Sequence, residues 1–99
     1  MPQIQFIVEI QTHAGAMPLL RDYEQQVRPV MEAHGGRLER VWQAKDQEFH
    51  LMVFESEAGF DAFNADPRRL ELSAKLSRVI TELTRSEVTE VPLDLYFGD

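Results

Sequence analysis

The sequence contains no cysteine. That absence excludes disulfide bonds, thiol nucleophiles and cysteine-ligated metal sites, and it fits a reducing compartment. Long apolar runs are also missing, and the amino-terminal Met1, Pro2 and Gln3 carry no cationic region. We therefore expect neither a membrane span nor a signal peptide, and we expect a cytoplasmic protein.

Basic residues are few. Ten lysines and arginines stand against 17 aspartates and glutamates, which gives a formal charge of −7. A chain with this excess of acid repels the phosphate backbone and lacks the counterion release that drives most nucleic-acid binding. We expect no nucleic-acid partner.

The remaining composition is that of a folded protein, with 43% hydrophobic and 27% charged residues. Residues 1–99 are expected to form a single domain. A domain of this size buries roughly 65% of the surface that its unfolded chain exposes, so its stability margin is small. A partner subunit would increase it.

The first half of the chain shows clear periodicity. Residues Ile4 to Gln11 alternate between apolar and polar, which predicts a half-buried strand. Apolar residues at three-to-four spacing then predict a helix ending near Ala33, with a kink at Pro29. After Gly35 and Gly36, where the chain reverses, strands are expected over residues 37–44 and 48–55.

The second half is predicted to contain a short helix capped by Ser56 and a longer helix beginning at Pro67. Apolar residues continue at helical spacing as far as Leu83, so we expect the longer helix to reach about Thr84. A last strand is expected from Ser86 to Val91, followed by an apolar tail.

This order of elements predicts an α+β fold of the ferredoxin-like βαββαβ type. Its four antiparallel strands would stand in the spatial order 4-1-3-2. The first and third predicted strands are the most apolar, as the two central strands of such a sheet should be.

Four short motifs follow one another along the chain: Tyr23 in the first helix, the segment His34–Arg37, the strand end Val53–Ser56, and the set Phe60, Phe63, Asp66 and Pro67. Together they resemble the dimeric α/β barrel superfamily. More narrowly, the chain resembles small bacterial families of unknown function and, more loosely, the NIPSNAP-like branch. The resemblance implies a homodimer in which two sheets pair face to face. The apolar tail at residues 92–99 is expected to pack on the partner subunit.

The resemblance does not identify a reaction. Related proteins include antibiotic-biosynthesis monooxygenases, haem-degrading enzymes, muconolactone isomerase and dye-decolourising peroxidases, so the scaffold supports many chemistries. The asparagine, tryptophan and histidine set of the haem degraders has no match in this sequence. No catalytic residue is therefore transferred from the superfamily.

Alternation along the central strands suggests which residues share a face. The more apolar face is expected to meet the helices; it consists of Ile4, Phe6, Val8, Ile10, Phe49, Leu51 and Val53. The other face would carry Glu9 on the first strand and His50, Met52 and Phe54 on the third. If Glu9 and His50 meet, the carboxylate would orient the imidazole and raise its pKa, making a general base. The alternative is that both are ordinary polar residues at a dimer interface.

Other ligand contacts are conceivable on the same face. Arg40 and Trp42 would provide an anion contact and an aromatic wall, and Met52 an apolar contact. Alternatively, Arg40 and Trp42 belong to an edge strand, with the arginine solvated and the tryptophan covering the core. Tyr23 falls in the apolar stripe of the first helix, which favours core packing over catalysis.

No metal or cofactor is expected. His13, His34 and His50 lack the short spacing of zinc ligands, and Gly35–Gly36 lacks the third glycine and helix start of a phosphate loop.

Two functions follow. The first is binding of a small hydrophobic organic molecule between the paired sheets, with a cofactor-independent monooxygenase or isomerase as its catalytic form. The second is a non-catalytic dimerisation or interaction module whose interior is filled by side chains. Whether the protein is an enzyme stays open at this point.

Overall fold

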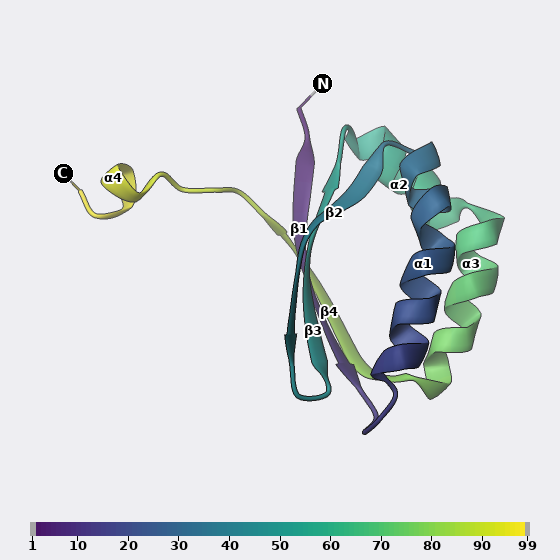
Figure 1. Cartoon of the computed structure of the whole chain (residues 1–99). Helices are drawn as coiled ribbons and strands as arrows, with labels where there is room; N and C mark the ends of the chain where they lie inside the picture. The colour runs from purple at the N-terminus through teal and green to yellow at the C-terminus, as the bar shows by residue number, and fades with distance from the viewer. Residues whose placement is uncertain (1, 99) are drawn as a thin grey trace.

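A computed structural model describes the chain from Pro2 to Gly98; Met1 and Asp99, the ends of the predicted domain and tail, lie outside the described residues. The elements follow one another as β1 (Ile4–Thr12), α1 (Met17–Ala33), β2 (Gly36–Ala44), β3 (Gln47–Phe54), α2 (Glu57–Ala65), α3 (Pro67–Ser73), the 3₁₀ helix η1 (Ala74–Arg78), β4 (Ile80–Val88) and α4 (Leu93–Tyr96). Figure 1 shows their arrangement.

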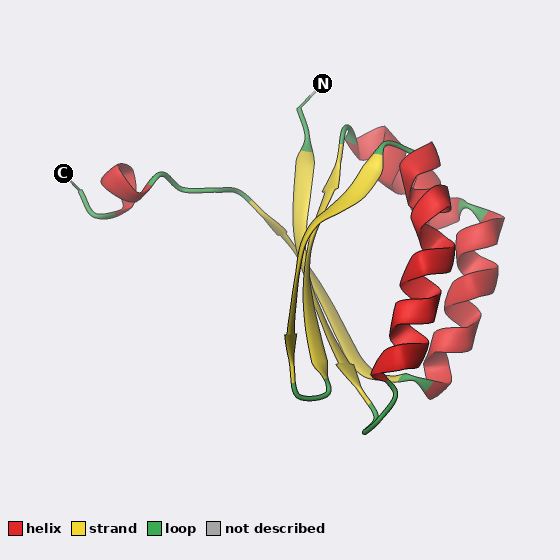
Figure 2. Cartoon of the chain, in the orientation of Figure 1, coloured by secondary structure: helices red, strands yellow, loops and turns green. Residues whose placement is uncertain are grey.

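The four strands form one antiparallel sheet in the order β2-β3-β1-β4. Read from the other edge, this is the predicted order 4-1-3-2, and the predicted α+β ferredoxin-like fold is confirmed. Helices α1, α2 and α3 cover one face of the sheet, and no other described helix covers the opposite face (Figure 2).

The register of β1 against β3 determines which side chains face the helices. Phe6 lies opposite Met52, and Val8 lies opposite His50. Directly opposed residues project to the same face of a sheet, so Met52 and His50 join the buried side of β1. The expected assignment of the faces of β3 was therefore wrong. His50, Met52 and Phe54 face the helices, while Phe49, Leu51 and Val53 lie on the open face.

An aromatic cluster holds α2 against this sheet. The rings of Phe6 and Phe60 stack with centroids 4.3 Å apart, and Phe54 lies 5.4 Å from both Phe60 and Phe63. Ser56 caps the helix as predicted, because its hydroxyl accepts a hydrogen bond from the Gly59 amide at 3.1 Å. Helix α1 adds Leu20, Val27, Val30 and Met31 to the same core.

The chain reversal between α1 and β2 depends on both glycines. Gly35 adopts a φ of +79°, a left-handed conformation that side chains with a Cβ rarely adopt. A Cβ on Gly36 would lie 2.4 Å from the Phe54 ring and 2.7 Å from the Met31 side chain. Gly36 thus allows the start of β2 to approach the core closely.

The predicted helix from Pro67 to Thr84 was wrong in its second half. Helix α3 ends at Ser73, a 3₁₀ turn follows, and β4 begins at Ile80, six residues before the expected Ser86. Over such a short stretch, apolar spacing fits a helix and a strand about equally well. Strand pairing decides between them. Residues 80–88 pair with Gln5–Thr12 of β1, whose backbone N–H and C=O groups on that side would otherwise have no partner in the sheet.

The tail leaves the end of β4 and extends away from the sheet and the helices (Figure 1). It contains the short helix α4, and Leu93, Leu95, Tyr96 and Phe97 are 69–72% exposed. Nothing in the single chain covers these four large apolar side chains. Their exposure to water is unfavourable, and burial against another surface would stabilise them.

Candidate functional site

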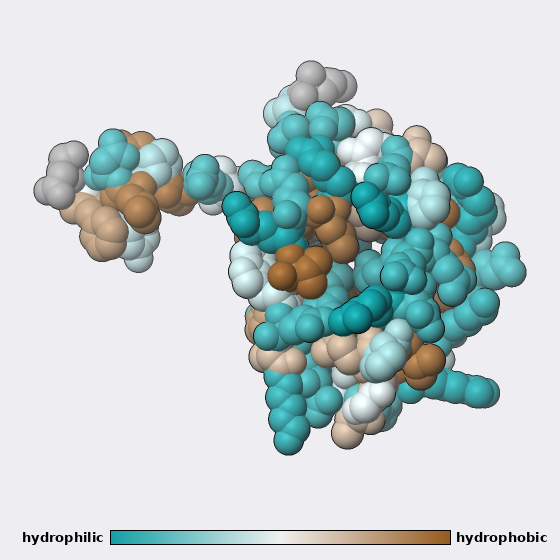
Figure 3. Space-filling model, viewed as in Figure 1, coloured by the Kyte–Doolittle hydropathy of each residue, from teal (hydrophilic) through white to brown (hydrophobic). Residues whose placement is uncertain are grey.

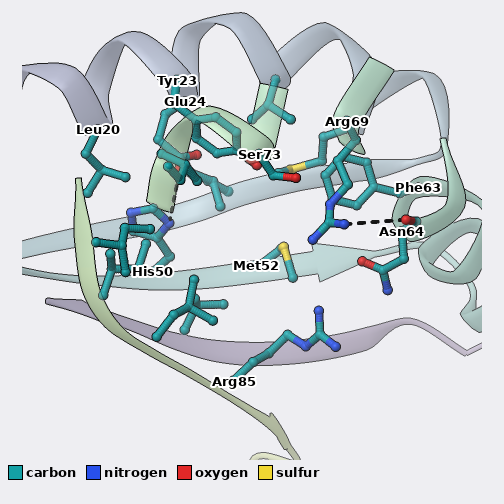
Figure 4. Close-up of a pocket in the computed structure, with 18 of the residues that line it drawn as sticks. Leu20, Tyr23, Glu24, His50, Met52, Phe63, Asn64, Arg69, Ser73 and Arg85 are labelled. Atoms are coloured by element: carbon teal, nitrogen blue, oxygen red, sulfur yellow. Dashed lines mark hydrogen bonds and ion pairs between the residues drawn. The ribbon is translucent and has the colours of Figure 1, made fainter. Parts of the chain in front are cut away.

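A cavity of about 390 Å³ lies between the sheet and the helices. Strands β1, β3 and β4, helices α1 and α3, and η1 all contribute to its lining (Figure 4). Most of the wall is apolar; the side chains that enclose it include Val8, Leu20, Val27, Met31, Met52 and Phe63. Leu83 and Arg85 of β4 also line it and are exposed, so the cavity opens toward this edge of the sheet. Figure 3 shows apolar side chains reaching the surface in the region between sheet and helices.

His50 lines the cavity and is 3% exposed. Its Nε2 lies 2.5 Å from Oε1 of Glu48, a buried carboxylate two residues earlier on the same strand. Since a carboxylate only accepts, Nε2 carries the proton. The second carboxylate oxygen of Glu48 accepts a hydrogen bond from the Gln43 amide at 2.8 Å. The ring is thereby fixed in one orientation, with Nδ1 directed toward α1.

Glu24 of α1 faces His50 from the opposite side. Its Oε1 lies 4.0 Å from Nδ1 of His50, and its side chain is 18% exposed (Figure 4). Burial raises the pKa of Glu24 from its ordinary value of 4.5 to about 7. The charge of His50 lowers this pKa and the charge of Glu48 raises it, and both effects are smaller than that of burial. A carboxyl with this pKa is populated in both protonation states near neutral pH, as a general acid or base must be.

Two arginines provide positive charge elsewhere in the cavity. Arg69 enters from α3, and its guanidinium points into the cavity toward Met52 (Figure 4). Arg85 enters from β4 and stacks on the aromatic cluster, with its guanidinium carbon 4.7 Å from the centre of the Phe60 ring.

Tyr23 of α1 also lines the cavity. It packs against the core, as predicted from its place in the apolar stripe of that helix. Burial raises the pKa of its phenol; the Glu24 charge adds to the effect and the Arg69 charge opposes it. The tyrosine therefore stands within the electrostatic reach of both groups.

The structure separates the predicted pair Glu9 and His50. Glu9 is paired with Phe49 and projects from the open face, where its carboxylate accepts a hydrogen bond from the Thr84 hydroxyl at 3.0 Å. His50 projects from the helix-covered face. The two side chains therefore do not meet, and the predicted pairing of Glu9 with His50 as a general base was wrong. The carboxylates beside His50 are those of Glu48 and Glu24.

Arg40 and Trp42 also lie on the open face. They pair with Leu51 and Phe49 after the register of β2 shifts between Leu38 and Arg40. Trp42 is 48% exposed and does not line the cavity. Met52 does line the cavity together with His50, and its contact with a ligand stays a prediction.

The sequence contained signals for the two missed carboxylates. Glu24 falls at helical spacing between Leu20 and Val27, and so interrupts the buried stripe of α1 with a charge. Glu48 shares a face with His50 by simple alternation. Arg69 carried no such signal, because only the packing of α3 on α1 brings it into the cavity.

Fold and site together define a ferredoxin-like α+β protein with a ligand-sized cavity beneath its helices. A NIPSNAP family protein of unknown function from Agrobacterium tumefaciens has a similar structure, with a TM-score of 0.74, 17% sequence identity, and coverage of 91% of this chain and 89% of that one. An uncharacterised NIPSNAP domain protein from Burkholderia xenovorans has the same TM-score of 0.74 at 11% identity, over 89% of this chain and 94% of its own.

A protein from Chloroflexus aurantiacus, provisionally assigned as an antibiotic biosynthesis monooxygenase, also has a TM-score of 0.74, with 18% identity over 91% of this chain and 94% of its own. These similarities confirm the ferredoxin-like fold of the single chain, and at such identities they establish that fold alone. No protein-family model and no curated protein matches the sequence.

Within residues 2–98, no three histidine, aspartate or glutamate side chains are grouped so as to hold a metal ion. In the same part of the chain, none of the helices has the length and apolarity needed to cross a membrane.

Proposed function

We propose that this protein is a homodimer that binds a small hydrophobic organic molecule in the cavity between its sheet and its helices. The observation that carries the proposal is the cavity itself. Its volume of about 390 Å³ falls within the range of small-molecule sites, roughly 300–1,000 Å³, and a few polar groups interrupt an apolar lining. This location replaces the expected one between paired sheets, because His50 and Met52 face the helices.

The dimer is supported by what the single chain leaves uncovered. The open face of the sheet carries Ile7, Trp42, Phe49 and Leu51, and the exposed tail extends to the same side of the molecule, away from the helices (Figure 1). Pairing of two open faces would bury these side chains. The tail would then lie against the partner subunit.

A catalytic form of this function is a cofactor-independent isomerase. The favouring observation is Glu24, whose pKa of about 7 suits proton transfer and whose position is held across from a buried, oriented imidazole. In this arrangement Glu24 exchanges the proton with the ligand, while His50 and Glu48 are positioning residues. A monooxygenase on the same site is the alternative chemistry, and a module that binds no ligand is the non-catalytic alternative.

Closing the mouth of the cavity tests ligand binding. Leu83→Trp places a large ring at the open edge of the cavity, where the native side chain is 50% exposed. Leu70→Trp on α3 is the matched control, since Leu70 is 49% exposed and does not line the cavity. Compounds from a library of apolar molecules that raise the melting temperature of the native protein should lose their effect in Leu83→Trp and keep it in Leu70→Trp. Equal shifts in all three proteins would contradict the proposed site.

A further inference from the structure

We propose that the molecule bound in this cavity is an organic acid, whose carboxylate is held by Arg69 while its apolar body fills the space below α1. This inference rests on the proposed ligand cavity and adds the chemical class of the ligand.

The first argument is the unsatisfied Nε of Arg69. Its Nε is buried and has no hydrogen-bond partner among the described residues. The only hydrogen bond recorded for this side chain within residues 2–98 runs from Nη1 to the Asn64 carbonyl oxygen at 3.4 Å, which is long. A buried N–H without a partner is costly, and cationic donors are the most costly to leave unpaired.

Two other arginines of this chain pair closely with carboxylates. Arg68 donates to both carboxylate oxygens of Asp66, at 2.8 and 3.1 Å. Arg37 contacts Glu39 at 2.8 Å and Glu55 at 2.6 Å. In the described part of this acidic chain, Arg69 contacts no carboxylate within 4.0 Å, although it lines the cavity.

The second argument is the distribution of charge and apolar surface around the cavity. Arg85 lines the same space from the sheet, so two guanidinium groups enter one cavity of a protein whose formal charge is −7. Between Arg69 and the Glu24–His50 end lies the apolar side chain of Met52, and most other lining residues are apolar as well (Figure 4). A molecule that satisfies both regions has an anionic group at one end and an apolar body.

A carboxylate fits Arg69 better than a neutral polar group does. A guanidinium presents parallel N–H donors that match the two oxygens of a carboxylate, and these charge-assisted bonds are about twice as strong as neutral ones. The acid would supply a partner for the orphaned Nε and its neighbouring nitrogen together. Glu24, at the far end, would then face the apolar body of the ligand rather than its charge.

The test compares 3-phenylpropanoate with 3-phenylpropanamide, its neutral counterpart, by isothermal titration calorimetry on the native protein. We expect the acid to bind at least about tenfold more tightly than the amide. Arg69→Gln should remove this preference while leaving the affinity for the amide unchanged, and Arg69→Lys should retain part of it. Arg78→Gln, an exposed arginine of η1 outside the cavity, is the control and should behave as the native protein.

The outcomes separate this inference from the proposal on which it rests. If acid and amide bind equally and Leu83→Trp blocks both, the cavity binds ligands but the organic-acid assignment is wrong. A preference for the acid that survives Arg69→Gln in a folded protein, checked by circular dichroism, would also overturn the assignment. Absence of any binding by both compounds counts against the ligand cavity itself.

Discussion

Glu24 is a carboxyl group placed within the buried stripe of a helix. Its neighbours on that stripe, Leu20 and Val27, are 0% and 1% exposed. Burial disfavours the charged form and outweighs the favourable charge of His50, so the pKa of Glu24 is raised from 4.5 to about 7. A helix selected for stability alone would carry an apolar residue here, and this supports the role proposed for Glu24 in the cavity.

This residue makes a prediction about stability and pH. Because the folded-state pKa of about 7 exceeds the ordinary value of 4.5, the folded protein holds the Glu24 proton more tightly than the unfolded chain does. The resulting stabilisation is complete below pH 4.5 and is lost as the pH rises through 7. Relative to Glu24→Gln, which cannot ionise, the native protein should lose on the order of 2–3 kcal/mol of unfolding free energy between pH 5 and pH 8.

Urea denaturation of both proteins at the two pH values measures this difference. Other carboxyl groups titrate in the native protein and in the variant alike, so subtracting the two curves isolates Glu24. Parallel curves would show that Glu24 titrates near its ordinary value.

At the scale of elements, Asp66 connects the end of α1 with the start of α3. Its carboxylate accepts from the Arg68 amide at 2.8 Å, which caps α3, and contacts Nε2 of His34 at 2.8 Å, at the carboxyl end of α1. The Arg68 and His34 hydrogen bonds hold the pKa of this carboxyl well below its usual range. Helix α3 in turn carries Arg69, so the position of the cavity arginine depends on this cap.

The predicted consequence is a loss of thermal stability in two steps. Asp66→Asn keeps the capping oxygen and loses the charge, whereas Asp66→Ala loses both. We expect the melting temperature at pH 7, followed by circular dichroism, to fall in Asp66→Asn and to fall further in Asp66→Ala. Because the pKa of Asp66 is lowered, its contribution is present at neutral pH and fades as the pH falls through that lowered value.

Asp61→Ala on the exposed side of α2 provides the control and should leave the melting temperature nearly unchanged. Equal melting temperatures for the native protein and Asp66→Ala would show that α3 is held by its packing alone.

At the scale of the whole molecule, helices cover one face of the sheet and leave the other open (Figure 2). Trp42 on the open face and four apolar side chains of the tail, Leu93, Leu95, Tyr96 and Phe97, are exposed in the single chain. The same arrangement isolates the cavity from the proposed interface, because the cavity lies on the covered side. Dimerisation and ligand binding should therefore be separable by mutation.

The native protein should sediment with twice the 11.4 kDa mass of one chain. Trp42→Glu places a charge on the open face and should shift this equilibrium toward the monomer. Val41→Glu is a closely matched control: Val41 precedes Trp42 on β2 and is 47% exposed against 48%, but it pairs with His50 and so projects to the other face. A native protein that sediments as a monomer, or equal mass shifts in the two variants, would contradict the proposed interface.

The sequence by itself determined the class of fold. The local signals were alternation in β1, the helical stripe of α1, the Gly35–Gly36 reversal, the Ser56 cap and the helix start at Pro67. Each predicted its element correctly because it depends on residues close together in the chain. The end of α3 was misplaced for the converse reason, since β4 becomes a strand only through its pairing with β1.

The site was decided by tertiary structure. Both faces of β3 carry large apolar residues, and the face that meets the helices is the one that also carries Glu48 and His50, so alternation alone predicted the wrong face. A shift of register by one residue exchanges the two faces. The pairing of Val8 with His50 resolved this, moving the histidine away from Glu9 and beneath α1. There it meets Glu48 and Glu24, and helix packing brings Arg69 into the same cavity. Contacts between residues distant in sequence depend on register and packing, and no local pattern records either.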